Sequence, residues 1–391
     1  MFISPSSQAF RHGTFRRDDR IVRVAIVTES FLPNVNGVTN SILRILDHLA
    51  DGPHESIVVA PGSGAVRHGR FEVHRVPSVG LPFYRDFNLA LPTPRLEQVL
   101  RDFSPDIVHL ASPFGFGAYA QKVARQLAIP TVAVFQTDVA GFVSQYGLEV
   151  AGQALWRWIG RLHARADLTL APSTHSIADL RRAGVERVAL WQRGVDATRF
   201  SPRHRDEGVR TRLAPAGETV VGYVGRLGAE KCVEDLAVLA GIPRITVVVV
   251  GDGPSRRRLE RALPNAKFLG FRSGLELSQL YASLDLFVHT GPHETFCQAV
   301  QEALASGVPV VAPARGGPVD LVQPGVTGAL YPVGDLAALR QHVAGLVASP
   351  RLRASMGAAA RASVVARTWR SIGSELEEHW RRVANRVPAA A

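Results

Sequence analysis

The sequence predicts an α/β protein of two similar domains, each built around a parallel sheet, that face each other across a cleft. Three observations lead to this fold class. Short β-branched runs alternate with stretches of helical periodicity, which is the pattern of strand–helix–strand units. This rhythm stops after Trp191 and restarts at Thr219. The chain has 391 residues, of which 46% are hydrophobic, and this is enough for two separate cores.

The first domain is predicted to cover residues 21–191. Residues 21–27 form an almost continuous apolar run, which is typical of a strand buried on both faces. A loop rich in Pro, Asn and Gly follows at 33–37, and residues 41–46 have helical spacing. Later strands are expected at 56–60, 107–110, 131–135 and 168–170. With helices between most of them, these strands predict a Rossmann-like sheet with right-handed crossovers.

The second domain is predicted to cover residues 219–367, after a linker at 192–218 that is rich in Arg, Pro, Asp and Gly. Its strands are expected at 219–224, 245–250, 284–288 and 308–311, and its helices at 233–240 and 296–305. Two such Rossmann-like sheets in tandem predict a ligand in the cleft between the carboxyl ends of their strands. A long basic helix is expected from Trp369 to about Asn385, within a C-terminal segment 368–391.

Composition narrows the class of partner. The net charge is +11, but the basic residues are scattered and no nucleic-acid-binding motif is present, so nucleic acid is not an expected partner. The two cysteines, Cys232 and Cys297, cannot form a disulfide framework or a tetrahedral metal site. Residues 1–20 are expected to be a disordered basic N-terminus, and because they lack an apolar segment they are not read as a secretory signal. A cytoplasmic protein is therefore predicted.

The most informative segment runs from His289 to Glu302. A strand is expected to end near His289, and a helix to start near Thr295. On such a helix Glu294 and Glu302 would be about 12 Å apart along the axis and about 80° apart around it. Two carboxylates at this spacing, with the helix N-terminus between them, suit a hexose, a diphosphate and a ribose. The alternative is that Glu294 is an N-terminal acid and Glu302 a solvated helix residue.

A second segment places two cations at the end of the strand at 219–224. Arg226 follows in a glycine loop, and Lys231 comes five residues later. An arginine fork and a lysine point charge can together hold a departing diphosphate. The alternative is that both are ordinary surface residues that form salt bridges.

A third segment, 115–120, fits the G-x-G-x-x-A dinucleotide pattern, with Asp138 about 20 residues later. Its strand is not the first of the chain, and Pro113 precedes the glycines, so dinucleotide binding is the less favoured interpretation. No metal-binding, Walker or hydrolase-elbow motif appears. The sequence therefore predicts neither a metal nor a cofactor.

From about residue 22 to residue 380, the chain resembles the retaining glycosyltransferases of family 4, which have the GT-B fold. It is most similar to the actinobacterial GDP-mannose-dependent α-mannosyltransferases that act on glycolipids. The resemblance rests on Thr28 to Val38, His109 to Pro113, Phe135 to Asp138, Arg193 to Asp196, Gly225 to Lys231, Gly251 to Pro254, and the Glu294-x7-Glu302 spacing. Four positions depart from the usual pattern of relatives: Ala111, Gln136, Cys232 and Asp320.

The resemblance implies a role for each matching residue. Arg226 and Lys231 would stabilise the leaving phosphate, and Glu294 would bind sugar hydroxyls. The other implied contacts are Thr295, Phe296, Glu302 and Gly37 on the donor side, and His109 and Asp138 on the acceptor side. Many relatives have His at the positions of Ala111 and Gln136, so no proton relay is assigned.

The implied activity is retaining, metal-independent transfer of mannose from GDP-mannose to a lipid or glycolipid, with α-linkage. The alternatives are a UDP-sugar donor, or a nucleotide-sugar epimerase or binding protein of the same fold. The C-terminal helix would cross back to the first domain, and the domains would close on the donor.

A helix at 154–166 pairs an apolar stripe with Arg157, Arg161 and Arg165, with Trp158 at its border. It predicts reversible binding to anionic membrane, on the inner face of the cell membrane. The alternative is an ordinary core-facing helix with a solvated arginine face.

Overall fold

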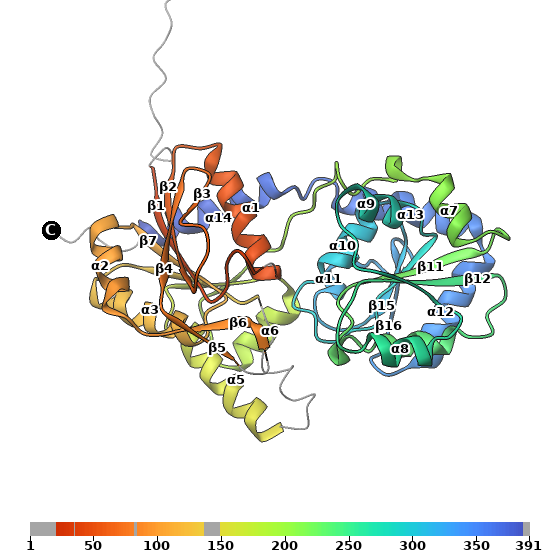
Figure 1. Cartoon of the computed structure of the whole chain (residues 1–391), viewed down its shortest axis with the longest axis horizontal. Coiled ribbons are helices and arrows are strands. Elements are labelled where there is room, and N and C mark those ends of the chain that lie inside the picture. The colour runs from red at the N-terminus through yellow and green to blue at the C-terminus, as the bar shows by residue number, and fades with distance from the viewer. Residues whose placement is uncertain (1–20, 35, 82–83, 137–148, 386–391) are drawn as a thin grey trace, which may run out of the picture.

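The computed structural model describes residues 21–34, 36–81, 84–136 and 149–385. Figure 1 shows two α/β domains side by side, with the C-terminal helix running back from the second domain to the first. The predicted fold class is therefore confirmed. The expectation for residues 1–20 lies outside the described residues. No helix in the described ranges is both long enough and apolar enough to cross a bilayer.

The first domain has a sheet of order β10-β9-β8-β7-β1-β2-β4-β3, parallel except for β3 against β4. Its strands are β1 (Arg23–Thr28), β2 (Glu55–Pro61), β3 (Arg67–His68), β4 (Phe71–Val76), β7 (Ile107–Ala111), β8 (Thr131–Val134), β9 (Leu168–Ala171) and β10 (Val188–Leu190). A separate hairpin pairs β5 (Ser78–Leu81) with β6 (Tyr84–Ala90). The central strands are buried along nearly their whole length, as their apolar runs require.

Helices cover both faces of this sheet (Figure 1). They are α1 (Gly37–Ala50), α2 (Pro94–Phe103), α3 (Gly115–Gln126), α5 (Glu149–Ala164) and α6 (Thr174–Arg182). The C-terminal helix α14 (Trp369–Ala384) shares one core cluster with α1, whereas α2 and α3 share the cluster on the other face.

The second domain has a six-stranded parallel sheet of order β13-β12-β11-β14-β15-β16. Its strands are β11 (Thr219–Val224), β12 (Ile245–Val250), β13 (Lys267–Gly270), β14 (Leu286–Val288), β15 (Val310–Pro313) and β16 (Gly328–Tyr331). Its helices are α7 (Glu207–Leu213), α8 (Arg256–Ala262), α9 (Gly274–Ala282), α10 (Gln298–Ala305), α11 (Pro318–Leu321), α12 (Leu336–Ala348) and α13 (Pro350–Val364). Three 3-10 segments are η2 (Pro202–His204), η3 (Ala229–Lys231) and η4 (Val233–Leu239).

The linker is shorter than the sequence predicted. Within 192–218, η2 and α7 are ordered parts of the second domain, and Phe200, Leu213 and Ala214 are buried in its core. The predicted helix at 233–240 is the 3-10 segment η4. The predicted helix at 296–305 begins two residues later, at Gln298, because Cys297 adopts a left-handed conformation with φ 75°.

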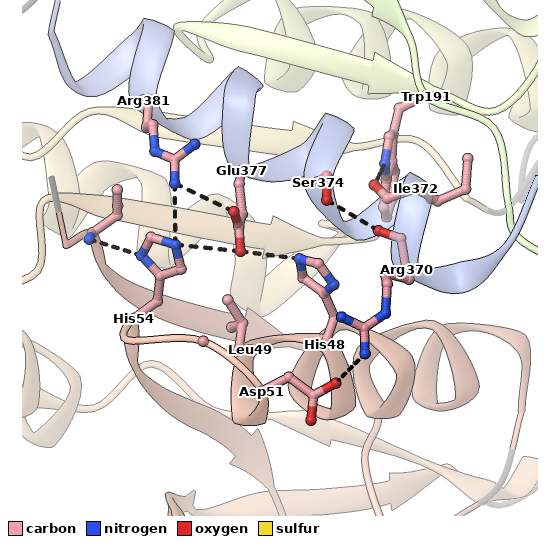
Figure 2. Close-up of polar contacts among 12 residues, drawn as sticks. His48, Leu49, Asp51, His54, Trp191, Arg370, Ile372, Ser374, Glu377 and Arg381 are labelled. Atoms are coloured by element: carbon pink, nitrogen blue, oxygen red, sulfur yellow. Dashed lines mark hydrogen bonds and ion pairs between the residues drawn. The ribbon is translucent and has the colours of Figure 1, made fainter. Parts of the chain in front are cut away.

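Helix α14 is fastened to the first domain by polar contacts as well as by packing. The indole Nε1 of Trp191 donates to the Ile372 carbonyl oxygen at 3.0 Å. Figure 2 shows Glu377 of α14 between two histidines of the first domain. Its Oε1 lies 3.0 Å from His48 Nε2 and 3.3 Å from His54 Nε2. The His54 Nδ1 in turn accepts the Val22 N–H at 3.0 Å, so this cluster ties the end of the chain to the start of β1.

Candidate active site

The candidate active site lies at the carboxyl edge of the second sheet. β11 and β14 are parallel neighbours in that sheet. The loop after β11 leads into η3, which carries Lys231. The loop after β14 carries Glu294, shortly before α10 begins. Because both loops leave the sheet at the same edge, side chains 63 positions apart in the sequence meet there.

Lys231 and Glu294 form the central contact of this site. The Lys231 Nζ lies 2.5 Å from Glu294 Oε1, and His289 Nε2 lies 3.3 Å from the same oxygen. Burial by itself would raise the pKa of Glu294, but Lys231 and His289 outweigh it and hold that pKa well below its usual range. Burial would likewise lower the pKa of Lys231, but Glu294 raises it. Both groups are therefore charged at neutral pH.

Arg226 lies at the rim of the site and not on Glu294. Its guanidinium pairs with Glu230 at 2.5 Å, and half of its side chain is exposed. The buried Glu230 thus holds the half-exposed Arg226 at the same strand end as Lys231. The structure places the two predicted cations at one strand end, but only Lys231 contacts the predicted carboxylate.

The loop that carries Glu294 is shaped by a glycine pair that the sequence analysis did not single out. The Gly317 N–H donates to the Glu294 carbonyl oxygen at 2.8 Å. A Cβ at Gly316 would lie 2.2 Å from that oxygen, and a Cβ at Gly317 would lie 2.0 Å from the Phe296 carbonyl oxygen. The close approach therefore requires glycine at both positions. The signal in the sequence was the dipeptide itself, at the start of α11.

The predicted geometry of the two carboxylates is wrong in one respect. Glu294 lies in the loop, and only Glu302 is on α10, so the distance and angle expected for one continuous helix do not apply. Glu302 is partly buried, and burial raises its pKa to about 7, although Tyr281 and Arg199 act in the opposite direction. Of the predicted donor-side residues between them, Phe296 is buried in the core. Thr295 reaches across to the first domain, where its Oγ1 donates to the Gln136 carbonyl oxygen at 2.9 Å.

Neither of the two acceptor-side predictions, His109 and Asp138, is confirmed. His109 on β7 is fully buried, and its Nδ1 accepts a hydrogen bond from Trp380 Nε1 at 3.3 Å. Burial lowers the pKa of His109 to about 3. The prediction that His109 faces an acceptor is therefore wrong, because α14 covers it. Asp138 lies outside the described residues.

Gly37, the remaining predicted residue, opens α1 at the edge of the first domain. Its carbonyl oxygen accepts a hydrogen bond from Arg193 Nη1 at 3.2 Å. Gln136, at the end of β8, lines a small pocket together with Ser112, Pro113, Phe114, Val134, Phe135, Ile159 and His163. Arg193 and the Gln136 side chain were not predicted as site residues, because they meet across 57 positions of the sequence. His289 was treated only as the end of a strand, although it faces Glu294 only five positions later.

The G-x-G-x-x-A segment has a structural explanation. It forms the start of α3, where the Glu29 carboxylate accepts the Phe114 and Gly117 N–H groups at 2.9 and 2.8 Å. A Cβ at Gly117 would lie 2.4 Å from the Pro113 side chain. The protein's own carboxylate therefore occupies the place where a helix N-terminus would bind a phosphate.

A group of potential metal ligands also lies in the site. The ligand atoms of His289, Glu294 and Cys297 are within 4.8 Å of one another. Lys231 already contacts that carboxylate, and burial raises the pKa of the Cys297 thiol well above its ordinary value. A metal ion would have to displace an ammonium group and ionise a buried thiol, so these residues fit a cation poorly.

Helix α5 packs in the core, as the alternative interpretation of its sequence expects. Ile159 and Leu162 are buried, and Trp158 packs edge-on against Phe114 with the ring centroids 5.0 Å apart. The apolar stripe therefore belongs to the core of the first domain and not to a membrane surface. The three arginines of the opposite face, Arg157, Arg161 and Arg165, are exposed.

Comparison with known proteins identifies the family of this chain. Residues 35–199 match the family model described as Glycosyltransferase Family 4, and residues 205–363 match the model described as Glycosyl transferases group 1. The chain belongs to glycosyltransferase family 4. The two matches correspond to the two domains of this glycosyltransferase, with their junction between Arg199 and Arg205.

Two curated relatives of this family 4 glycosyltransferase carry the same name. A GDP-mannose-dependent alpha-mannosyltransferase of Mycolicibacterium smegmatis is 51% identical over 372 residues, which cover 93% of this chain and 98% of the relative. The protein of that name from Corynebacterium glutamicum is 46% identical over 378 residues, which cover 94% and 92%. The resemblance read from the sequence is confirmed.

Solved structures show the same fold at low sequence identity. The Anabaena protein HepE, in complex with UDP, matches with a TM-score of 0.74 at 22% identity, covering 92% of this chain and all of that chain. Sucrose-phosphate synthase from Thermosynechococcus elongatus matches with a TM-score of 0.76 at 21% identity, covering 93% of this chain and all of that one. The expected GT-B fold is confirmed.

Proposed function

We propose that this glycosyltransferase transfers mannose from GDP-mannose to a lipid or glycolipid acceptor, with retention of the α configuration. Relatives 46–51% identical over nearly the whole chain, each named a GDP-mannose-dependent alpha-mannosyltransferase, support the donor. A relative 28% identical over 304 residues, named for a phosphatidylinositol dimannoside, supports the class of acceptor. The single structural observation that carries the proposal is the charged Lys231–Glu294 pair at the strand ends.

The chemistry follows from where charge develops. When the bond from the sugar to the diphosphate breaks, negative charge grows on the leaving phosphate and positive charge on the sugar ring. Lys231, with Arg226 beside it, supplies fixed positive charge to the phosphate. The ionised Glu294 accepts hydrogen bonds from sugar hydroxyls next to that charge, and Glu302 accepts those of the ribose. Retention requires attack on the face that the phosphate leaves, with a phosphate oxygen accepting the acceptor's proton.

Transfer without a metal or cofactor is part of the proposal. In many phosphate-transfer sites a divalent cation neutralises the leaving group. Here Lys231 and Arg226 supply that charge from the protein itself, and the one carboxylate among the potential cation ligands of the site, Glu294, already contacts Lys231.

The acceptor places the enzyme at a membrane. With its apolar stripe packed in the core, α5 would meet a bilayer through the exposed Arg157 and Arg161, together with Arg165 just after its end. Each arginine near an anionic surface contributes about 1 kcal/mol. We therefore propose salt-sensitive, peripheral binding to the inner face of the cell membrane. The N-terminal domain makes the contact through these side chains.

The test follows radiolabelled mannose from GDP-mannose in the presence and absence of anionic vesicles that carry a glycolipid acceptor. The proposal predicts label in the organic phase only when acceptor is present, with one GDP released for each mannose transferred. Conversion of the donor without acceptor would indicate an epimerase. Binding without any turnover would indicate a sugar-nucleotide-binding protein.

A further inference from the structure

Arg193 lies where the chain passes between the two domains. The chain first passes from the first domain to the second after β10, which ends at Leu190. It returns to the first domain just before α14, which begins at Trp369. The two crossings run side by side here, because the Val195 N–H donates to the Arg367 carbonyl oxygen at 2.9 Å. A Cβ at Gly194 would lie 2.6 Å from the backbone of Trp369. Arg193 is thus next to the place where any rotation of the domains must occur.

The backbone of Arg193 is held by the second domain. The Gln301 Nε2 of α10 donates to the Arg193 carbonyl oxygen at 3.0 Å. The Gln298 Nε2, one turn earlier on the same helix, donates to the Gly194 carbonyl oxygen at 3.1 Å. The residue therefore moves with the helix that follows the Glu294 loop.

The side chain of Arg193 is held by the first domain. Its Nη1 donates to the Gly37 carbonyl oxygen at 3.2 Å, and its Nη2 donates to the Gln136 Oε1 at 2.8 Å. Gly37 opens α1, whereas Gln136 follows β8. A single planar guanidinium thus joins two loops of the first domain that are 99 positions apart, which a lysine ammonium cannot do in the same way.

Gln136 completes a path from this arginine to the donor loop. Its side chain is held by Arg193, and its carbonyl oxygen accepts a hydrogen bond from Thr295 Oγ1 at 2.9 Å. Thr295 is the neighbour of Glu294. Burial lowers the pKa of Arg193 to about 10, against the opposing effect of Glu294, so the guanidinium keeps its charge at neutral pH.

We propose that Arg193 is a positioning residue for glycosyl transfer, which fixes the loops of Gly37 and Gln136 against the donor loop of Glu294. It holds the two halves of the site in register and does not touch the reacting atoms. This proposal rests on the proposed transferase function, because register across the cleft matters only where groups of both domains must meet a substrate. A misplacement of about 1 Å at such a site can lower the rate about 100-fold.

The experiment compares Arg193→Gln and Arg193→Lys with Arg203→Gln as the matched control. Arg203 belongs to the same segment and is exposed, and its bonds stay within that segment: it donates to the Thr198 carbonyl oxygen at 3.0 Å and to His204 Nε2 at 3.5 Å. We expect kcat to fall about 100-fold in Arg193→Gln, to a smaller extent in Arg193→Lys, and not at all in the control. Apart from the contact that the resemblance implies for Gly37, the proposed contacts of GDP lie in the second domain, so the affinity for GDP should change less than about threefold.

Two further readouts separate positioning from folding and from donor binding. Small-angle scattering of the free enzyme and of its GDP complex should show a wider spread of domain distances in Arg193→Gln than in the wild type. In a double-mutant cycle, Gln136→Ala should add almost no loss of kcat to Arg193→Gln, because the shared contact is already gone.

An equal loss of GDP affinity and kcat would overturn the proposal and make Arg193 a donor-binding residue. An unchanged kcat together with unchanged scattering would overturn it as well. If the wild type does not use GDP-mannose, the proposed function fails. The scattering of the free enzymes would still decide the role of Arg193.

Discussion

Replacing Lys231 by Met separates the stabilising role of the Lys231–Glu294 pair from its catalytic role. In the wild type only 22% of the Lys231 side chain and 17% of the Glu294 side chain are exposed. Removing one partner of a buried ion pair costs about 3–5 kcal/mol, because the other charge stays buried without compensation. His289 still faces Glu294 from 3.3 Å, so we expect the lower end of this range, about 3 kcal/mol.

Glu294→Gln in the same background provides the decisive comparison. The double variant Lys231→Met, Glu294→Gln leaves no unpaired charge, so its stability should return to within about 1 kcal/mol of the wild type. Its transferase activity should not return. Each single variant and the double variant should lose about 100-fold or more in kcat, which corresponds to about 2.7 kcal/mol of transition-state stabilisation.

The assays are urea unfolding, followed by the fluorescence of the five tryptophans, and initial rates of mannose transfer. Near-normal turnover of a folded Lys231→Met enzyme would refute the assignment of Lys231 to the leaving group. A double variant as unstable as Lys231→Met would refute the claim that the unpaired Glu294 charge causes the loss.

Four further outcomes are expected. Adding EDTA should leave the rate nearly unchanged, since the protein supplies the cations; a loss restored by Mg²⁺ or Mn²⁺ would show that the site was misread. Replacing Arg157, Arg161 and Arg165 by Gln should weaken cosedimentation with anionic liposomes at low salt and leave GDP-mannose binding alone, whereas unchanged cosedimentation would remove α5 from the membrane contact. Burial raises the pKa of Glu302 to about 7, so this carboxyl group ionises, and becomes a better hydrogen-bond acceptor for the ribose, between pH 6 and 8. The affinity for GDP-mannose, measured by titration calorimetry, should therefore rise over this range in the wild type but not in Glu302→Gln. Equal pH dependence in the two proteins would exclude Glu302 from the ribose contact. Burial opposes but does not cancel the effect of His48 and His54, which lower the pKa of Glu377 from 4.5 to about 2. The stabilising contribution of Glu377 is therefore complete above about pH 4.5 and is lost as the pH falls towards 2. Unfolding scans of Glu377→Gln should accordingly show a weaker loss of stability on acidification than scans of the wild type.

The central strands of both sheets could be predicted because burial on both faces forces long apolar runs. The strands β3, β4, β10, β13 and β16, at or next to the sheet edges, are only partly buried and were not predicted. The pair of Lys231 and Glu294 could be placed at one edge for a related reason, since both follow parallel strands. Helix α7 could not be predicted in the same way. It is an arginine-rich helix whose only buried residue is Leu213, so it carries no apolar periodicity.

The errors at the site come from long-range contacts and from one unusual backbone conformation. His109 follows the expected strand pattern, and nothing local shows that Trp380, 271 positions away, covers it. The start of α10 depends on the left-handed conformation of Cys297, which is uncommon for a residue other than glycine. Arg193 lies in a segment whose composition indicates a linker, and only the folded chain shows that it bonds to Gly37 and Gln136.

The central claim is the identity of the donor, and a competition experiment tests it most directly. Equal concentrations of GDP-mannose, UDP-glucose and UDP-galactose are supplied together with glycolipid acceptor, and mass spectrometry identifies the nucleotide released and the sugar added. The account predicts GDP as the released nucleotide and a mannosylated lipid as the product. Release of UDP with transfer of glucose or galactose would contradict it.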